Sequence, residues 1–256
     1  MLESLNKLRD LHVHATDGDI GEVTDSYFDD ERWVVRYLVV STGGWLSGRK
    51  VLVSPYAISG VDAQRRAVVT ALTRRQVQDS PSIDTAQPIS RQQETGYLRY
   101  YGYPVYWPYA TMWAWGAMPV VTPPDPGLRE ELLAAERPES DTGSATDVHL
   151  RSVREVVGYH IHASDDAIGH VEDFLFDDSS WAIRYVVVDT RNWLPGKQVL
   201  LSPHWIREVS WAERLVRVEL TRSGVETSPV FDAAHPPSRH YEEQLHRHYR
   251  RPGYWH

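Results

Sequence analysis

The feature that most constrains the fold is an internal repeat. The stretch "HVHATDGDIGEVTDSYFDDERWVVRYLVV" from His12 aligns with "HIHASDDAIGHVEDFLFDDSSWAIRYVVV" from His160, and this offset of 148 residues holds without a gap to the C-terminus. Self-similarity at a fixed offset indicates that both copies build the same fold. A chain of 256 residues is long enough for two small domains. The sequence therefore predicts two homologous units of about 95 residues each.

The unit boundaries follow from where the repeat stops. We expect a first unit over residues 1–107, a linker over 108–149 and a second unit over 150–256, with each unit ending in a helix and an aromatic tail. The segment between the copies has a proline cluster, then a short helical pattern and then the polar run "PESDTGSATD". That composition is typical of a linker.

Strand signals dominate each unit. Short runs of β-branched and aromatic residues alternate with turn residues about every 8 to 12 positions. The run from Trp33 to Val40, "WVVRYLVV", is almost continuously apolar, as in a strand buried on both faces. Ser90 followed by Gln93 forms a capping box, so a helix should begin there. We predict a mainly β protein with short helices, built from two small, partly open antiparallel β-barrels.

The same patterns predict the buried core. Apolar positions that alternate along the expected strands, at equivalent places in both copies, should be shielded from water. These are Ile20, Val23, Phe28, Val35, Tyr37, Val39, Leu52 and Leu72, with Ile168, Val171, Phe176, Ile183, Tyr185, Val187, Leu200 and Leu220.

The repeated motifs resemble a known family. The elements G-x-V-x-D, F-D-D, R-Y followed by apolar residues, G-(R/K) and S-P occur in one order in both copies, over about residues 8–84 and 156–232. Together they resemble the PRC-barrel family. The resemblance implies a partly open β-barrel, often dimeric, that works as a docking module, as in the H subunit of photosynthetic reaction centres and in a ribosome-maturation factor. It implies no catalytic residue set.

Composition narrows the function classes. A net charge of −8 argues against a general nucleic-acid binder, which needs a concentrated basic surface. The absence of cysteine removes disulfides and thiolate chemistry. No window offers 18 consecutive apolar residues, and the N-terminus shows no apolar signal region. We expect a cytoplasmic protein without a transmembrane segment.

Two H-x-H pairs are weak metal-site candidates. Alternation along a strand places both imidazoles of a pair on one face, a geometry that zinc sites can use. Such a pair is more often the solvated face of an edge strand. No calcium-loop pattern, phosphate loop or nucleophile motif accompanies them. We therefore expect no metal, no cofactor and no enzymatic activity; the weak candidates are His12, His14, His160 and His162.

An arginine interrupts the most apolar strand of each copy. A charge there must reach water or meet a carboxylate. Asp25 and Asp173, on the preceding strands, are the predicted partners of Arg36 and Arg184 in structural ion pairs.

The run "YGYPVYWPYATMWAWG" over residues 101–116 is dense in aromatic rings. Its first half recurs at the C-terminus, so we expect each aromatic tail to fold back onto a barrel, its own or the opposite one. The unrepeated tryptophans should cover the seam between units, and contact with a membrane interface is the alternative. The repeated residues are Tyr101, Pro104, Tyr106 and Trp107 with Tyr249, Pro252, Tyr254 and Trp255, and the unrepeated ones are Trp113 and Trp115.

These patterns favour a non-enzymatic protein-interaction or assembly module built from two barrels related by a pseudo-twofold axis. One alternative is a peripheral membrane adaptor that uses the aromatic segment. Another is a small-ligand binder or an uncharacterised enzyme in the groove between the barrels. The partner is expected to be a protein of unidentified kind, and further homodimerisation is possible.

Overall fold

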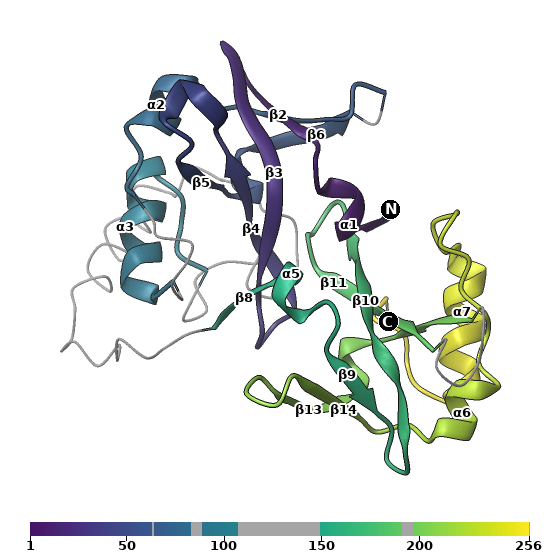
Figure 1. Cartoon of the computed structure of the whole chain (residues 1–256). Coiled ribbons are helices and arrows are strands. Elements are labelled where there is room, and N and C mark those ends of the chain that lie inside the picture. Colours follow the sequence, from purple (N-terminus) through teal and green to yellow (C-terminus); the bar gives the residue numbers. More distant parts are fainter. Residues whose placement is uncertain (63, 83–88, 107–148, 191–196, 256) are drawn as a thin grey trace, which may run out of the picture.

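The protein folds around two seven-stranded, largely antiparallel sheets (Figure 1). The structure is a computed structural model that describes residues 1–62, 64–82, 89–106, 149–190 and 197–255. The expected linker lies almost entirely outside these residues.

The first sheet has the strand order β5-β4-β3-β2-β7-β6, with β8 added to β3. All neighbours are antiparallel except β2 and β7, which run parallel. The apolar run beginning at Trp33 forms β4, whose residues are buried except the last, as the sequence predicts. The strands are β2 (His12–Ala15), β3 (Gly18–Asp29), β4 (Val34–Ser41), β5 (Lys50–Val53), β6 (Ile58–Asp62), β7 (Ala67–Thr70) and β8 (Leu150–Ser152).

The second sheet repeats this order as β12-β11-β10-β9-β14-β13, with β1 added to β10. Within the described residues neither sheet closes on itself, so the predicted mainly β, partly open architecture is confirmed. The strands are β9 (His160–His162), β10 (Ala167–Asp177), β11 (Ile183–Asp189), β12 (Gln198–Leu201), β13 (Ile206–Ser210), β14 (Leu215–Val218) and β1 (Leu2–Ser4).

Short helices connect and flank the sheets. The capping box at Ser90 and Gln93 opens α3, as predicted, because each side chain satisfies a backbone N–H that the helix leaves free. The helices are α1 (Leu5–Leu8), α2 (Arg74–Gln78), α3 (Arg91–Tyr101), α5 (Val153–Val156), α6 (Arg222–Glu226) and α7 (Arg239–His248), with 3-10 turns η1 (Gly43–Leu46), η2 (Pro55–Ala57) and η4 (Pro203–Trp205).

The two halves exchange strands. β1, at the start of the chain, pairs with β10 of the second sheet, and β8, which leads into the second half, pairs with β3 of the first sheet (Figure 1). The registers match under the repeat offset, since Leu2 faces Asp177 and Leu150 faces Asp29. Such reciprocity is the arrangement that a pseudo-twofold axis produces.

Backbone hydrogen bonds also cross directly between the halves. The amide of Val35 donates to the carbonyl of Trp181 over 2.9 Å, and the amide of Ile183 donates to the carbonyl of Trp33 over 2.7 Å. Trp33 and Trp181 both adopt positive φ angles, 57° and 61°. A left-handed conformation is costly for a bulky residue, so its presence at both equivalent positions marks a junction that the surroundings hold firmly.

The core continues through this junction. The rings of Phe28 and Phe174, from opposite halves, have centroids 5.6 Å apart, and one buried apolar cluster contains residues of both halves. All sixteen core residues predicted from the sequence are buried. Buried aromatic rings remove a large apolar area from water and so stabilise the packing between the halves. The two halves therefore share a core as well as strands.

Candidate functional site

A buried carboxylate lies beneath α3 in the first half. Glu94, in the first turn of that helix, is fully buried. Tyr37 and Tyr106 donate hydrogen bonds to its Oε1 over 2.9 and 2.7 Å, and His149 Nε2 lies 2.7 Å from its Oε2. A buried carboxylate is tolerated when donors surround it in this way. We call Glu94, Tyr37, Tyr106 and His149 the first polar cluster.

A buried arginine covers this cluster. The Arg36 guanidinium lies 3.9 Å from the centre of the Tyr106 ring and donates to Asp29 Oδ2 over 3.1 Å. Arg36 has no exposed surface, and the side chain of Asp29 is 4% exposed. The charge is therefore balanced by a carboxylate and by the face of an aromatic ring.

The second half holds a related set of residues beneath α7. Glu242 Oε2 accepts hydrogen bonds from Tyr185 over 3.0 Å and from Tyr254 over 2.7 Å. Arg239 Nη1 lies 3.2 Å from its Oε1, and His246 Nε2 lies 3.0 Å from the Tyr185 hydroxyl. We call these five residues the second polar cluster.

The pKa values of the histidines in the two clusters are shifted in opposite directions. Burial would lower the pKa of His149, but the hydrogen bond and charge of Glu94 outweigh it and raise that pKa. Burial lowers the pKa of His246. Burial raises the pKa of Tyr37 and Tyr106 well above 10, so both stay protonated donors near neutral pH. The first cluster is thus a buried, hydrogen-bonded network that suits a structural role.

The predicted partners of the two strand arginines were wrong. Arg36 pairs with Asp29, and Arg184 Nη2 lies 3.7 Å from Asp177 Oδ2. Each of these aspartates ends the strand that precedes the arginine's own, so the hairpin brings it to the arginine. Asp25 pairs with Val39 and Asp173 pairs with Val187, so each predicted aspartate faces a residue three positions beyond the arginine.

Asp25 and Asp173 instead tie the two halves together. Asp25 accepts hydrogen bonds from the Ser152 hydroxyl over 2.6 Å and from the Arg154 amide over 3.1 Å. Asp173 makes the same contacts with the Ser4 hydroxyl and with the amide of residue 6. Burial raises the pKa of both carboxyl groups, although these hydrogen bonds offset part of the effect. Each aspartate therefore holds the first helix of the opposite half.

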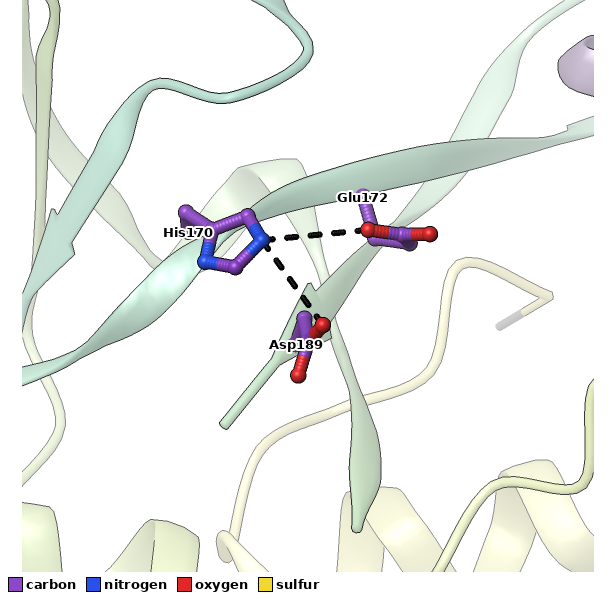
Figure 2. A group of neighbouring side chains, drawn as sticks. All are labelled: His170, Glu172 and Asp189. Atoms are coloured by element: carbon purple, nitrogen blue, oxygen red, sulfur yellow. Dashed lines mark ion pairs between the residues drawn. The ribbon is translucent and has the colours of Figure 1, made fainter. Parts of the chain in front are cut away.

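The two H-x-H pairs lie on different sheets, so their four imidazoles do not converge on one metal site. His12 and His14 share a face of β2 with ring centroids 6.5 Å apart; His14 contacts Asp19, and His12 lies 3.8 Å from Glu22. On β9, His160 and His162 are exposed. Among the described residues, the trio of side chains close enough to share a metal ion lies elsewhere, at His170, Glu172 and Asp189 (Figure 2).

Both aromatic tails fold onto their own sheet. Tyr106 is buried within the first polar cluster, and the ring of Tyr101 stacks 5.5 Å from that of Tyr103. In the second half, Arg184 lies 4.3 Å over the Tyr254 ring, and Trp255 packs 5.0 Å from His246. Pro104 and Tyr249 are partly buried, whereas Pro252 is exposed. The predicted positions Trp107, Trp113 and Trp115 lie outside the described residues.

A groove runs between the two halves. Its volume is about 680 Å³, and its apolar lining comes from Leu8 and Leu11 in the first half and from Phe176 and Trp181 in the second. One wall is β6, which is an edge strand of the first sheet, and its Val61 side chain is 45% exposed.

Sequence reasoning missed several residues of these sites. His149 aligns with Met1, so the repeat hides it. Glu94 and Glu242 recur at equivalent positions on the two helices, which was a usable signal of a shared role. His170 and Glu172 follow the same alternation as the H-x-H pairs, but Asp189 joins them only through strand pairing.

Comparison with known proteins agrees with the sheet architecture. Residues 2–77 match the family model described as the PRC-barrel domain. A comparison with curated proteins finds no match. Among the described helices, none is both long and apolar enough to cross a membrane. PRC-barrel domains are generally non-catalytic interaction or assembly domains, and the first half of this chain, from β1 to α2, carries the match to that family.

Proposed function

We propose that this protein is a non-enzymatic interaction module in which two PRC-barrel-type units, the second formed by residues 150–256, together bind a protein partner. The observation that carries the proposal is the groove between the halves, with an apolar floor and a sheet edge as one wall. An exposed strand edge offers free N–H and C=O groups, and an apolar groove beside it offers burial for alternate side chains. The fitting occupant is an extended segment of the partner that adds a strand to β6.

The equivalent edge strands β6 and β13 support this choice because their side chains differ. β6 carries Ser59 and Gly60 where β13 carries Arg207 and Glu208. Charged side chains on an edge strand discourage pairing with another chain. Of the edge strands β6 and β13, the one beside the groove is therefore the one that lacks charged side chains at these two positions.

The same difference supplies the test. The double variant Ser59→Arg/Gly60→Glu gives β6 the charges of β13, and a side chain at position 60 meets no atom within 4 Å. The matched control is Val230→Arg, at a valine that is 61% exposed in the second half and does not line the groove. Both variants should keep the fold, which circular dichroism would verify.

The readout is quantitative capture of proteins from native lysate. Wild type and the control should retain the same partner, and the double variant should lose it by at least about tenfold, since strand addition carries much of the affinity. Equal retention by all three proteins would contradict the proposal. The proposal also places the protein in the cytoplasm, which fractionation of native cells would test.

A further inference from the structure

We infer that His170, Glu172 and Asp189 form a binding site for a divalent transition-metal ion, with Zn²⁺ as the best match. The three side chains come together on one face of the second sheet (Figure 2). This site is separate from the groove proposed to bind a protein partner.

Strand pairing places the three ligands. His170 on β10 is the register partner of Asp189, the last residue of β11. A Cβ at Gly169 would lie 2.0 Å from the carbonyl oxygen of Asp189, so glycine permits the two strands to approach closely at this point. The register shift between residues 171 and 173 leaves Glu172 outside the ladder, and a bulge of this kind re-aims a side chain.

The distances fit an ion between the side chains better than direct hydrogen bonds. His170 Nε2 lies 3.7 Å from Asp189 Oδ2 and 3.8 Å from Glu172 Oε2, and all three ligand atoms lie within 4.8 Å of one another. Both contacts to Nε2 are too long for hydrogen bonds. Ligands about 2.1 Å from a tetrahedral zinc ion stand about 3.4 Å apart, so small side-chain rotations would close the site.

The ligand types point to the same class of ion. Carboxylate oxygens and a histidine nitrogen are ligands that divalent metal ions accept in proteins. The Asp189 side chain has no exposed surface, whereas Glu172 and His170 reach solvent. One imidazole nitrogen with two carboxylate oxygens suits zinc and its neighbours, whereas calcium and magnesium prefer oxygen alone.

The first half provides an internal comparison. The positions equivalent to these ligands hold Glu22, Thr24 and Ser41, although Glu22 and Ser41 are paired in the same register. Without the second carboxylate and the histidine, this set lacks the ligands for zinc. We therefore expect one site per chain, in the second half.

The experiment is calorimetric titration of the metal-free full chain with zinc chloride, with a competing chelator to fix the affinity. Wild type should bind one equivalent with micromolar affinity or tighter. His170→Gln/Glu172→Gln alters only the two solvent-accessible ligands and leaves the buried Asp189 in place, so it should fold. We expect it to weaken binding by at least about 100-fold. The matched control, His12→Gln/His14→Gln in the first half, should bind as wild type does.

Two results would overturn the inference. One is the absence of stoichiometric zinc binding to the wild-type protein. The other is unchanged binding by His170→Gln/Glu172→Gln with loss in the His12→Gln/His14→Gln control, which would move the site to β2. X-ray absorption at the zinc edge adds an independent readout, because the site should show one imidazole and two carboxylates as ligands.

Discussion

The first and second polar clusters occupy equivalent positions beneath α3 and α7, yet they obtain their histidine differently. In the first half, His149 comes from the segment that leads into the opposite half, and it pairs with Glu94. In the second half, His246 comes from α7 itself and contacts Tyr185, while Arg239 neutralises Glu242. The first half therefore completes its network with a residue from the segment that leads into the second half, whereas all five residues of the second polar cluster lie within residues 150–256.

This difference shows that the two halves are unequal partners despite their common strand order. Asp25 and Asp173 make the same contacts with the opposite half, and the exchanged strands have matching registers. The electrostatic centres are the part that has diverged. The first half buries an Arg36–Asp29 pair almost completely, but the equivalent Arg184–Asp177 pair remains about one fifth exposed. Variants at equivalent positions therefore separate the shared architecture from the divergent charges.

The largest expected difference concerns these two ion pairs. Arg36→Met should destabilise the protein by about 3–5 kcal/mol, because it leaves Asp29 buried without its cation. Arg184→Met should cost only about 1 kcal/mol, because water still reaches Asp177. Urea denaturation of the two variants measures both values. Equal shifts of the denaturation midpoint would show that burial of the first pair has no energetic consequence.

The next comparison should show no difference between the halves. Val39 and Val187 occupy equivalent positions in β4 and β11 and are both buried. Each substitution to alanine should cost about 1–3 kcal/mol through lost burial and a residual cavity. Agreement of the two costs within about 0.5 kcal/mol would confirm that the apolar cores are equivalent. A negligible cost for Val39→Ala would contradict the packing of β4.

The smallest effect is a pH dependence of opposite sign in the two halves. The pKa of His149 is raised in the folded protein, so its contribution is present below about pH 6.5 and is lost as pH rises through the folded pKa. The pKa of His246 is lowered, so its contribution is present above about pH 6.5 and is lost as pH falls.

Substitution of each histidine by glutamine tests these signs. His149→Gln should reduce stability more at pH 5.5 than at pH 8, and His246→Gln should do the reverse. Urea midpoints at the two pH values provide the measurement. Parallel pH profiles for both variants would mean that the two histidines do not differ in charge, and the contrast between the clusters would then fail.

Much of the fold could be predicted from the sequence because it depends on local patterns. The nearly continuous apolar run from Trp33 to Val40 predicts a buried strand and the capping box at Ser90 predicts a helix start, and both are present. The exchanged strands could not be predicted because β1 and β8 have only three residues each and acquire their conformation from the opposite sheet.

The candidate sites were less predictable because they depend on register and on chain segments that break the repeat. Arg36 lies at the register shift between Tyr27 and Phe28, and it pairs with Asp29 at the end of β3 and not with Asp25, which faces Val39. The spacing of residues in the sequence does not reveal such a register shift. His149 is a further example, since its repeat counterpart is Met1.

The most direct test of whether the two halves are interlocked is to cut the chain between them and measure whether the fragments stay together. A recognition site for a specific protease can be inserted in the polar run over residues 138–147, which lies outside the exchanged strands and both polar clusters. After complete cleavage, native mass spectrometry should still find the two fragments as a one-to-one complex, because strand pairs, aspartate contacts and a common core join them. Separation of the fragments at micromolar concentration under native conditions would contradict the account.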